Sequence, residues 1–275
     1  MLTPRKRVCD MTCEDMRSEL KVMRRKVSGD KSDLRSRLRE VCNENDRGWL
    51  RNVHGQTTGG AYLASGEHRH VYAATYSKGP RKGEPAVYKV FKTPGCQFER
   101  QFFDQDIRAV QKAASIIREF NEMYEHYTLG EDAIKRIYLN QPEVWTSVGD
   151  ETELCLVEPR IEGRFVKFNS NTGWVLDSDN LSEALTHFSY HRTKGAFLLC
   201  DIQGGEYPSH FVLTDPVVHS VTREFGATDG GPEAMTSFFA RHRCGRFCQP
   251  GWARAAPYGM PARYAAVPGT RFFVR

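Results

Sequence analysis

Three side chains that can bind a metal ion lie within seven residues near the end of the chain, in the stretch FFARHRCGRFC. They are His242, Cys244 and Cys248. Imidazole nitrogen and thiolate sulfur are ligands of tetrahedral zinc, at about 2.0 Å and about 2.3 Å from the ion, and structural zinc sites nearly always have four ligands. The spacing therefore predicts a structural zinc site whose fourth ligand comes from elsewhere in the chain.

The redox state of the eight cysteines decides whether such a site can form. The N-terminal run MLTPRKRVCDMTCEDMRSEL lacks the apolar core of a signal peptide, and no later apolar run approaches the roughly 20 residues that cross a bilayer. We therefore expect an intracellular protein, cytoplasmic or nuclear, with no membrane partner. In that setting we expect Cys244 and Cys248 to be thiolates and not halves of disulfides.

A second group of polar side chains follows two predicted strands, GAFLLC and HFVL. Asp201 and Gln203 come directly after the first strand, beside two glycines, and Asp215 comes after the second in the run LTDP. An isolated Asp in such a place is usually a turn former, but two strands that end in D-x-Q and T-D-P are harder to explain in that way. Carboxylate and amide oxygens are the ligands that Mg²⁺ prefers.

A lysine, Lys89, lies inside a third apolar run, PAVYKVFK. A buried ammonium group is costly unless it meets an anion, and a nucleotide phosphate is one candidate; a strand with one face in water is the alternative. With Lys89 on phosphates and Asp201 beside an acceptor hydroxyl, the pattern fits phosphoryl transfer. The sequence has no GxxxxGK[ST], HRD or DFG motif, which excludes P-loop NTPases and ordinary protein kinases.

The elements that must position these groups are of mixed type. Residues 70–76 and 85–92 are short runs rich in Val, Tyr and Phe on either side of a turn, as in a β-hairpin. Residues 97–140 have the 3.6-residue periodicity of a helix that stops at Gly130. Another strand leads to Glu158, and the chain then turns at Gly163.

The N-terminal segment has its own pattern. The first 50 residues carry 13 Lys or Arg and 9 Asp or Glu, a net charge of 13 − 9 = +4, against +5 for the whole chain. Two short helices are predicted within residues 12–42, separated by Gly29. Their apolar positions recur at i, i+4 and i+7, first at Met16, Leu20 and Met23, then at Leu34, Leu38 and Val41. A helical hairpin docked on the main domain is the structural alternative.

This segment resembles the SAP domain, a DNA-binding helix-extended-helix module. Arg24 and Arg25 stand where that family usually has Gly-Leu. The resemblance implies weak, salt-dependent binding of residues 1–48 to DNA phosphates, with little sequence preference. The positions that match are Met16, Leu20, Val27, Ser28, Gly29, Lys31, Leu34, Arg37 and Leu38.

The region from about Ala64 to Cys248 resembles the alpha-kinase family of atypical serine/threonine protein kinases. The resemblance rests on VYKVF, VEPRIEGRFVKFNSNTGW, THFSYHRTKGAFLLCDIQG, LTDPVVHS and FGATDGGPEAMTSFFARHRCGRFC, in the family's order and spacing. It implies that the fourth zinc ligand is His187, fourteen residues before Asp201. The expected zinc ligands are then His187, His242, Cys244 and Cys248.

The resemblance also implies roles for the other polar residues. Asp201 would be the catalytic carboxylate, together with Lys89 on the ATP phosphates, and Gly226–Gly231 would form a loop near the peptide substrate. Gly205 departs from the family, which prefers an aliphatic residue there. The residues expected to contact ATP or its Mg²⁺ are Arg69 in a loop over the phosphates, Lys89, Glu158 and the Arg160 backbone at the adenine, Lys167 and Asn171 nearby, and Gln203 and Asp215 as magnesium ligands.

We therefore expect an α+β, two-lobed atypical protein kinase fold at residues 50–250 with a zinc-stapled C-lobe. A SAP-like hairpin at 1–48 would precede it, and a disordered tail at 251–275, in which TRFFVR could dock, would follow. The predicted reaction transfers the γ-phosphoryl group of Mg-ATP to a serine or threonine of a protein substrate. The alternative is a zinc-stabilised pseudokinase that binds DNA or a partner without catalysis. The joint presence of the four groups Lys89, Asp201, Gln203 and Asp215 favours catalysis.

Overall fold

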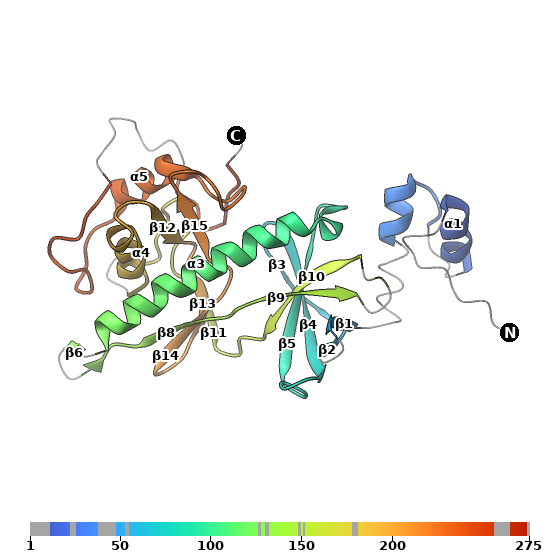
Figure 1. Cartoon of the computed structure of the whole chain (residues 1–275), viewed down its shortest axis with the longest axis horizontal. Coiled ribbons are helices and arrows are strands. Elements are labelled where there is room, and N and C mark those ends of the chain that lie inside the picture. Colours follow the sequence, from blue (N-terminus) through green and yellow to red (C-terminus); the bar gives the residue numbers. More distant parts are fainter. Residues whose placement is uncertain are drawn as a thin grey trace. The chain divides into compact units, whose positions relative to one another are not determined.

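The computed structural model describes residues 12–22, 26–37, 48–52, 55–125, 128–129, 132–147, 150, 152–177, 181–255 and 265–273. The chain divides into two compact units (Figure 1). Unit 1 comprises Met1–Phe103 and Pro142–Arg160, and unit 2 comprises Asp104–Gln141 and Ile161–Arg275. Among the described residues, no helix is both long enough and apolar enough to span a bilayer.

A seven-stranded antiparallel sheet forms the body of unit 1. The predicted hairpin is confirmed, because β4 and β5 pair with Tyr72 opposite Tyr88. One face of β5 contributes Ala86 and Tyr88 to a core with Trp145, while Lys89 faces the other way, since side chains alternate along a strand. The strand order is β2 (Gly55–Thr58), β1 (Gly48–Asn52), β9 (Glu143–Ser147), β10 (Leu154–Pro159), β5 (Pro85–Phe91), β4 (Arg69–Lys78) and β3 (Tyr62–Ser65), and a 3-10 turn at Cys96–Phe98 follows β5.

Unit 2 combines helices with smaller sheets. The helices are α3 (Arg100–Tyr124, in this unit from Asp104 onward), α4 (Leu181–Arg192) and α5 (Gly231–Arg241). A four-stranded sheet has the order β11 (Arg164–Lys167), β13 (Gln203–Glu206), β14 (His210–Leu213) and β8 (Arg136–Leu139). Two strand pairs accompany it: β12 (Phe197–Cys200) with β15 (Val217–Ser220), and β6 (Thr128–Leu129) with β7 (Asp132–Ala133).

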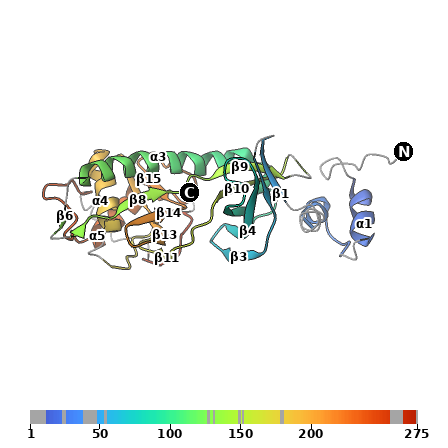
Figure 2. The same cartoon turned by 90° about the horizontal axis from the view of Figure 1, so that it is seen from below.

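The helix α3 covers the four-stranded sheet and packs against α4 (Figure 2). The rings of Phe120 and Phe188 have centroids 5.3 Å apart, and Ile137 of β8 lies in the same core. The helix predicted over 97–140 is therefore right for Arg100–Tyr124 and wrong for Arg136–Leu139. The latter residues form a strand because they pair in parallel with β14. Their side chains alternate as in a strand, with Arg136 exposed and Ile137 buried.

The two predicted N-terminal helices are present at α1 (Cys13–Val22) and at residues 31–37. Their apolar positions Met16, Leu20 and Leu34 are fully buried. Two arginines bind the extended segment between the helices: Arg17 donates to the carbonyls of Val27 and Gly29, and Arg37 donates to those of Lys26 and Ser28. The other predicted apolar positions, Met23, Leu38 and Val41, lie outside the described residues.

Part of the C-terminal tail also makes contacts. Residues 265–273 belong to the segment predicted to lack stable structure, yet they form hydrogen bonds to residues up to about 100 positions earlier in the chain, and Phe273 is buried. The expectation of disorder fails here because it rested on the absence of periodicity, which reports only local structure. The docking suggested for TRFFVR is present as far as Phe273; Val274 and Arg275 lie outside the described residues.

Candidate active site and metal centre

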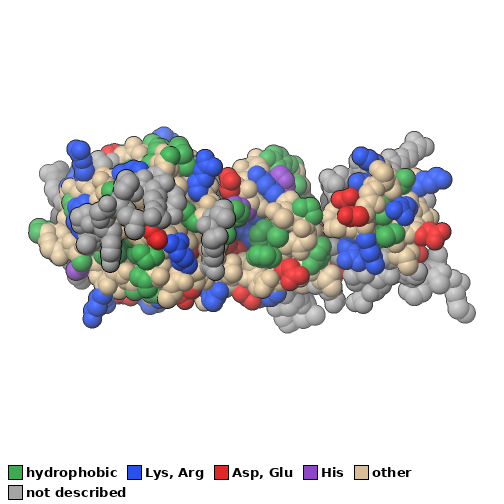
Figure 3. Space-filling view, turned by 90° about the horizontal axis from the view of Figure 1, so that it is seen from above, with side chains coloured by type: hydrophobic (Ala, Val, Ile, Leu, Met, Phe, Trp, Pro, Cys, Tyr) green, Lys and Arg blue, Asp and Glu red, His purple; other side chains and the backbone are tan. Residues whose placement is uncertain are grey.

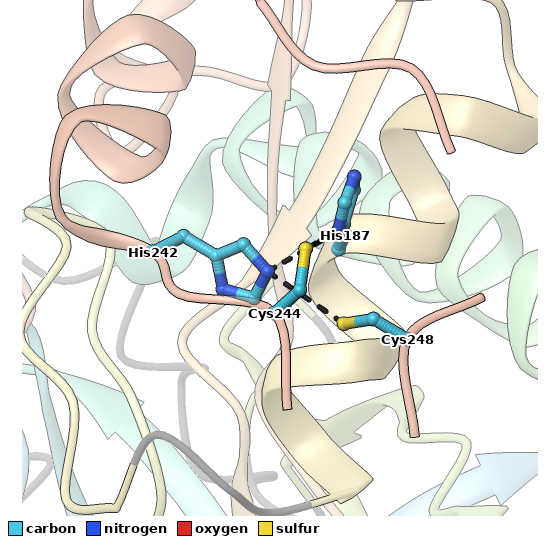
Figure 4. A group of neighbouring side chains, drawn as sticks. All are labelled: His187, His242, Cys244 and Cys248. Atoms are coloured by element: carbon cyan, nitrogen blue, oxygen red, sulfur yellow. Dashed lines mark hydrogen bonds between the residues drawn. The ribbon is translucent and has the colours of Figure 1, made fainter. Parts of the chain in front are cut away.

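The four predicted metal ligands come together in unit 2, as Figure 4 shows. His187 lies on α4, His242 caps the end of α5, and Cys244 and Cys248 lie in the loop that follows. Their four ligand atoms all lie within 4.8 Å of one another. The Nε2 atom of His242 is 3.1 Å from Nδ1 of His187, while Cys244 Sγ is 3.6 Å from His187 Nδ1 and Cys248 Sγ is 3.7 Å from His242 Nε2.

These spacings fit a tetrahedral metal ion. Bonds of about 2.0 Å to nitrogen and about 2.3 Å to sulfur place neighbouring ligand atoms about 3.3 to 3.8 Å apart. Burial and the neighbouring Cys244 raise the pKa of the Cys248 thiol to about 12. Two thiolates side by side repel each other, and a divalent cation between them would stabilise both.

Hydrogen bonds to the outer ring nitrogens fix the two histidines. His187 Nε2 can donate to the Ala253 carbonyl oxygen at 3.1 Å, and His242 Nδ1 can donate to Glu183 Oε2 at 3.0 Å. These bonds select the tautomers in which the lone pairs of His187 Nδ1 and His242 Nε2 point toward the centre of the four-residue cluster, where a metal ion would bind. Burial, followed by the neighbouring His242, lowers the pKa of His187 to about 4, so the ring is neutral, as a ligand must be.

Asp201 lies immediately after β12 and is 1% exposed. Lys167 Nζ donates to its Oδ1 at 2.8 Å, the backbone N–H of Asn171 donates to the same oxygen at 3.2 Å, and the Thr270 hydroxyl donates to Oδ2 at 2.6 Å. Burial raises the pKa of Asp201, while the Lys167 ammonium and the hydrogen bonds oppose that rise. The result is a carboxylate that is withdrawn from water, oriented on both oxygens and in contact with a hydroxyl group.

The chain segments that carry Asp201 and Asp215 run side by side. Cys200 of β12 is opposite Val217 of β15, and the N–H of Thr214 donates to the carbonyl of Gln203 at 3.0 Å, so the intervening residues are held from both ends. Both aspartates have positive φ, 60° and 50°. Such backbone costs on the order of 1–3 kcal/mol in a non-glycine residue and is concentrated at functional sites.

Gln203 lies close to Asp201, and the two glycines that follow it allow close packing. The Gln203 amide nitrogen is 3.5 Å from Asp201 Oδ2. Gly204 allows the close approach of β14, because a Cβ there would lie 2.1 Å from the Val212 carbonyl oxygen. At Gly205 a Cβ would lie 2.4 Å from Ile161 Cγ2, which gives the departure from the family at this position a local steric reason.

In unit 1, Lys89 is 4% exposed and its Nζ lies 2.7 Å from Glu158 Oε1. Leu156 is opposite Lys89 and Glu158 is opposite Val87, so Lys89 and Glu158 are diagonal neighbours on one face of the sheet. The anion that the buried lysine requires is therefore supplied by Glu158. Pairing stabilises both buried charges. The adenine contact expected of Glu158 stays a prediction.

The other nucleotide residues predicted in unit 1 also have protein partners. Arg69 is the first residue of β4 and directly follows the turn at residues 66–68. Its guanidinium lies 4.0 Å from the centroid of the Phe91 ring. The backbone N–H of Arg160 donates to the Pro85 carbonyl at 3.1 Å. That N–H therefore already has an acceptor within the sheet.

Asn171, which is predicted to lie near the nucleotide, binds two chain segments of unit 2. Its side chain receives a bond from Arg271 N–H at 2.9 Å and donates to the Arg271 carbonyl at 2.7 Å and to the Thr228 carbonyl at 3.1 Å. Its own carbonyl lies 3.0 Å from His219 Nε2. Burial lowers the pKa of His219 to about 4, so His219 is neutral and can donate Nε2–H here while its Nδ1 accepts from the Gly230 N–H at 2.9 Å.

Several residues that organise the site were not predicted. Asp229 is buried in the glycine-rich loop, where it accepts hydrogen bonds from Ser220 and from the N–H groups of Phe225 and Gly231. Its position inside GATDGG was the available signal. Glu183 and Thr270 carried no signal, since a helix glutamate and a tail threonine are common surface residues.

The comparisons with known proteins agree with this architecture. The match to the alpha-kinase family covers residues 64–248. Alpha-protein kinase vwkA of Dictyostelium discoideum is 37% identical over 97 residues, 34% of this chain and 15% of that protein. Eukaryotic elongation factor 2 kinase of Caenorhabditis elegans is 29% identical over 157 residues, 56% of this chain and 19% of that protein. The chain thus spans less than a fifth of either relative.

Solved structures show the same fold. An alpha-kinase from Entamoeba histolytica superposes with a TM-score of 0.63 at 21% identity, covering 95% of each chain. The alpha-kinase domain of myosin-II heavy chain kinase A, solved in complex with AMP-PNP, gives a TM-score of 0.61 at 21% identity over 70% of this chain and 85% of that one. With the family match extending over 64–248, which is well over half of 275 residues, this chain belongs to the alpha-kinase family.

Proposed function

We propose that this chain is an ATP-dependent protein serine/threonine kinase, which transfers the γ-phosphoryl group of Mg-ATP to a hydroxyl group of a protein. The observation that carries the proposal is the environment of Asp201, a buried carboxylate that accepts a hydrogen bond from a hydroxyl at 2.6 Å while Lys167 holds its other oxygen at 2.8 Å. Phosphoryl transfer to a protein needs a carboxylate of this kind at the acceptor hydroxyl. Membership of the alpha-kinase family supports the same reaction.

In the proposed reaction Asp201 orients the acceptor hydroxyl and receives its proton. The distance of 2.6 Å lies in the range that proton transfer requires, and the raised pKa makes this carboxylate a better proton acceptor than an exposed aspartate. Lys167 keeps Asp201 ionised before transfer, because the ammonium stabilises the carboxylate.

ATP is proposed to bind through Lys89, with Glu158 holding the lysine in place. Gln203 and Asp215 are the proposed magnesium ligands, since they offer amide and carboxylate oxygens and Asp215 is exposed. When bound, Mg²⁺ neutralises charge on the phosphates. Arg69 is the proposed further phosphate contact, since it begins β4, the strand that pairs with β5 and its Lys89.

The metal centre is proposed to hold structural zinc, because two imidazoles and two thiolates at tetrahedral spacing form the donor set of such sites. The proposed role is to join α4 to the loop after α5. Its chemistry is structural only, since all four positions are taken by protein ligands.

The N-terminal hairpin is proposed to be a SAP-like module that binds DNA weakly. Figure 3 shows Lys and Arg side chains on this hairpin among Asp and Glu side chains. Exposed Arg17, Lys21 and Lys31 supply positive charge, whereas exposed Glu14 and Asp33 reduce it. The mixture supports weak, salt-dependent binding at most. The proposed location is intracellular.

The kinase proposal is tested with the purified chain, Mg-[γ-³²P]ATP and a basic protein as general acceptor. We expect incorporation of label that requires Mg²⁺ and that falls by at least about a hundredfold in Asp201→Asn. An exposed aspartate of the same unit, Asp177, serves as matched control, and Asp177→Asn should keep full activity. No transfer by the wild type to any acceptor would support the pseudokinase alternative.

A further inference from the structure

The C-terminal segment at residues 265–273 passes directly over Asp201. The Thr270 hydroxyl donates to Asp201 Oδ2 at 2.6 Å and lies 3.3 Å from Lys167 Nζ. Lys167 and Asp201 are themselves joined at 2.8 Å. A threonine hydroxyl thus lies where the proposed reaction requires an acceptor hydroxyl.

The backbone on either side of Thr270 is also bound. One position later, the N–H and C=O of Arg271 form two hydrogen bonds with the Asn171 side chain, at 2.9 Å and 2.7 Å. Three positions earlier, the N–H and C=O of Val267 bond to the Thr172 hydroxyl at 3.0 Å and 3.2 Å. Because these bonds go to main-chain atoms, any peptide in the same conformation could form them if it has no proline at the positions of Val267 and Arg271.

A side chain is selected three positions after the hydroxyl. Phe273 is 8% exposed, its N–H donates to the Ala227 carbonyl at 2.9 Å, and its ring centroid lies 5.9 Å from that of His219. A Cβ on Gly230 would lie 2.8 Å from a ring carbon of Phe273, so a glycine is needed to make room for the ring. The neighbouring Phe272 is 50% exposed.

We propose that residues 267–273 occupy the acceptor-peptide site, and that the protein substrates are extended segments with an aromatic residue three positions after the phosphorylated serine or threonine. This inference rests on the proposed kinase activity. Asn171 aligns the backbone after the acceptor, and the pocket formed by Ala227, Gly230 and His219 receives the ring. The chain's own tail is then a tethered competitor of those substrates.

Transfer to a bound peptide exchanges one bond at the γ-phosphorus for another. The acceptor oxygen forms a bond to the γ-phosphorus, the bond between that phosphorus and the β,γ-bridging oxygen breaks, and ADP leaves. The hydroxyl proton passes to Asp201 and then to solvent. The co-reactant is the ATP of the proposed function.

The peptide AAVPGTRFFV, which copies residues 265–274, is the first probe, with the full chain as enzyme. We expect it to be phosphorylated. Replacement of its second Phe by Ala should raise KM by about tenfold or more, because that ring becomes buried. Replacement of its first Phe should change KM by less than about twofold, because that ring stays exposed. Equal effects of the two replacements would overturn the inference.

The second probe uses the tail in place. A tethered segment has an effective concentration in the millimolar range, so weakening it should expose the site to free peptide. In full-length Phe273→Ala the KM for a good acceptor peptide should fall by roughly fivefold or more, whereas Phe272→Ala should match the wild type. Unchanged KM in Phe273→Ala would contradict the placement of the tail in the acceptor site.

Failure of this inference differs from failure of the proposed function. If the wild-type chain phosphorylates the basic protein but the peptide series shows no dependence on the ring, the enzyme is a kinase and the inference is wrong. If no acceptor of any kind is phosphorylated while the chain remains folded by circular dichroism, the kinase proposal itself is rejected, and the inference is rejected with it.

Discussion

The buried pair of Lys89 and Glu158 allows a quantitative test of how unit 1 is stabilised. Both side chains are almost fully buried, at 4% and 3% exposed, and their charged atoms are 2.7 Å apart. Removing one partner of a buried ion pair leaves an uncompensated charge and costs about 3–5 kcal/mol. At 1.36 kcal/mol per factor of ten, Glu158→Leu should increase the opening equilibrium of β5 and β10 by about 150- to 5,000-fold.

The assay is peptide-resolved hydrogen exchange of the segments that contain β5 and β10. Glu158→Leu and Lys89→Met should each accelerate exchange by that factor, while the double variant should recover most of the protection, because replacing both charges with apolar groups is often neutral. The coupling in this double-mutant cycle should therefore be about 2 kcal/mol or more. Single variants that exchange like the wild type, or a double variant whose loss is the sum of the two single losses, would refute the pairing.

Three further predictions concern unit 2. Asp201→Asn should reduce turnover by at least about a hundredfold with little change in ATP affinity, measured by single-turnover transfer and by calorimetry; a variant with full turnover would contradict the proposed base. Cys244→Ser should lower the zinc content found by mass spectrometry and unfold unit 2 at a lower temperature, since metal-binding free energy is folding free energy, and a Cys96→Ser control should do neither. Burial lowers the pKa of His219 to about 4, from 6.5 in the unfolded chain, so the unfolded state binds more protons between these two pH values. The stability of β15 and of the glycine-rich loop that follows it should therefore fall as the pH decreases from 6.5 to 4. His219→Gln should flatten this dependence in hydrogen exchange, and an unchanged slope would show that His219 does not titrate there.

Much of the fold could be predicted because the signals are local. The pairing of β4 with β5 follows from two β-rich runs around a turn, and α3 follows from its periodicity. The strand β8 was missed because RIYL is too short to show a period of two by itself, and it becomes a strand through its parallel partner β14, which lies over 70 residues later. Long-range pairing of this kind has no signature in a short window of sequence.

In the candidate site, too, some residues could be predicted from local sequence signals and others could not. The candidate metal ligands His242, Cys244 and Cys248 could be predicted from residue type and spacing alone, whereas His187 needed the family's pattern. The partner of Lys89 could not be found in either way. The resemblance assigned Glu158 to adenine, and the register of β5 against β10, which places the two charges side by side, is a property of the folded sheet.

Two polar residues that were not predicted join the candidate metal centre to the chain segment that carries Asp201. Glu183 binds His242 through Oε2 and accepts from Asn169 Nδ2 through Oε1 at 2.9 Å, and Asn169 Oδ1 in turn accepts from the N–H of Ile202 at 2.9 Å. Glu183 and Asn169 are each 1% exposed, so every bond in the series is made away from water, where an unsatisfied partner is costly. Ile202, whose N–H donates the last of these bonds, directly follows Asp201. A metal ion bound to His242 would therefore also restrict the backbone on which the positive φ of Asp201 depends. This would give a structural metal ion a reason to lie within the same unit as the proposed catalytic carboxylate.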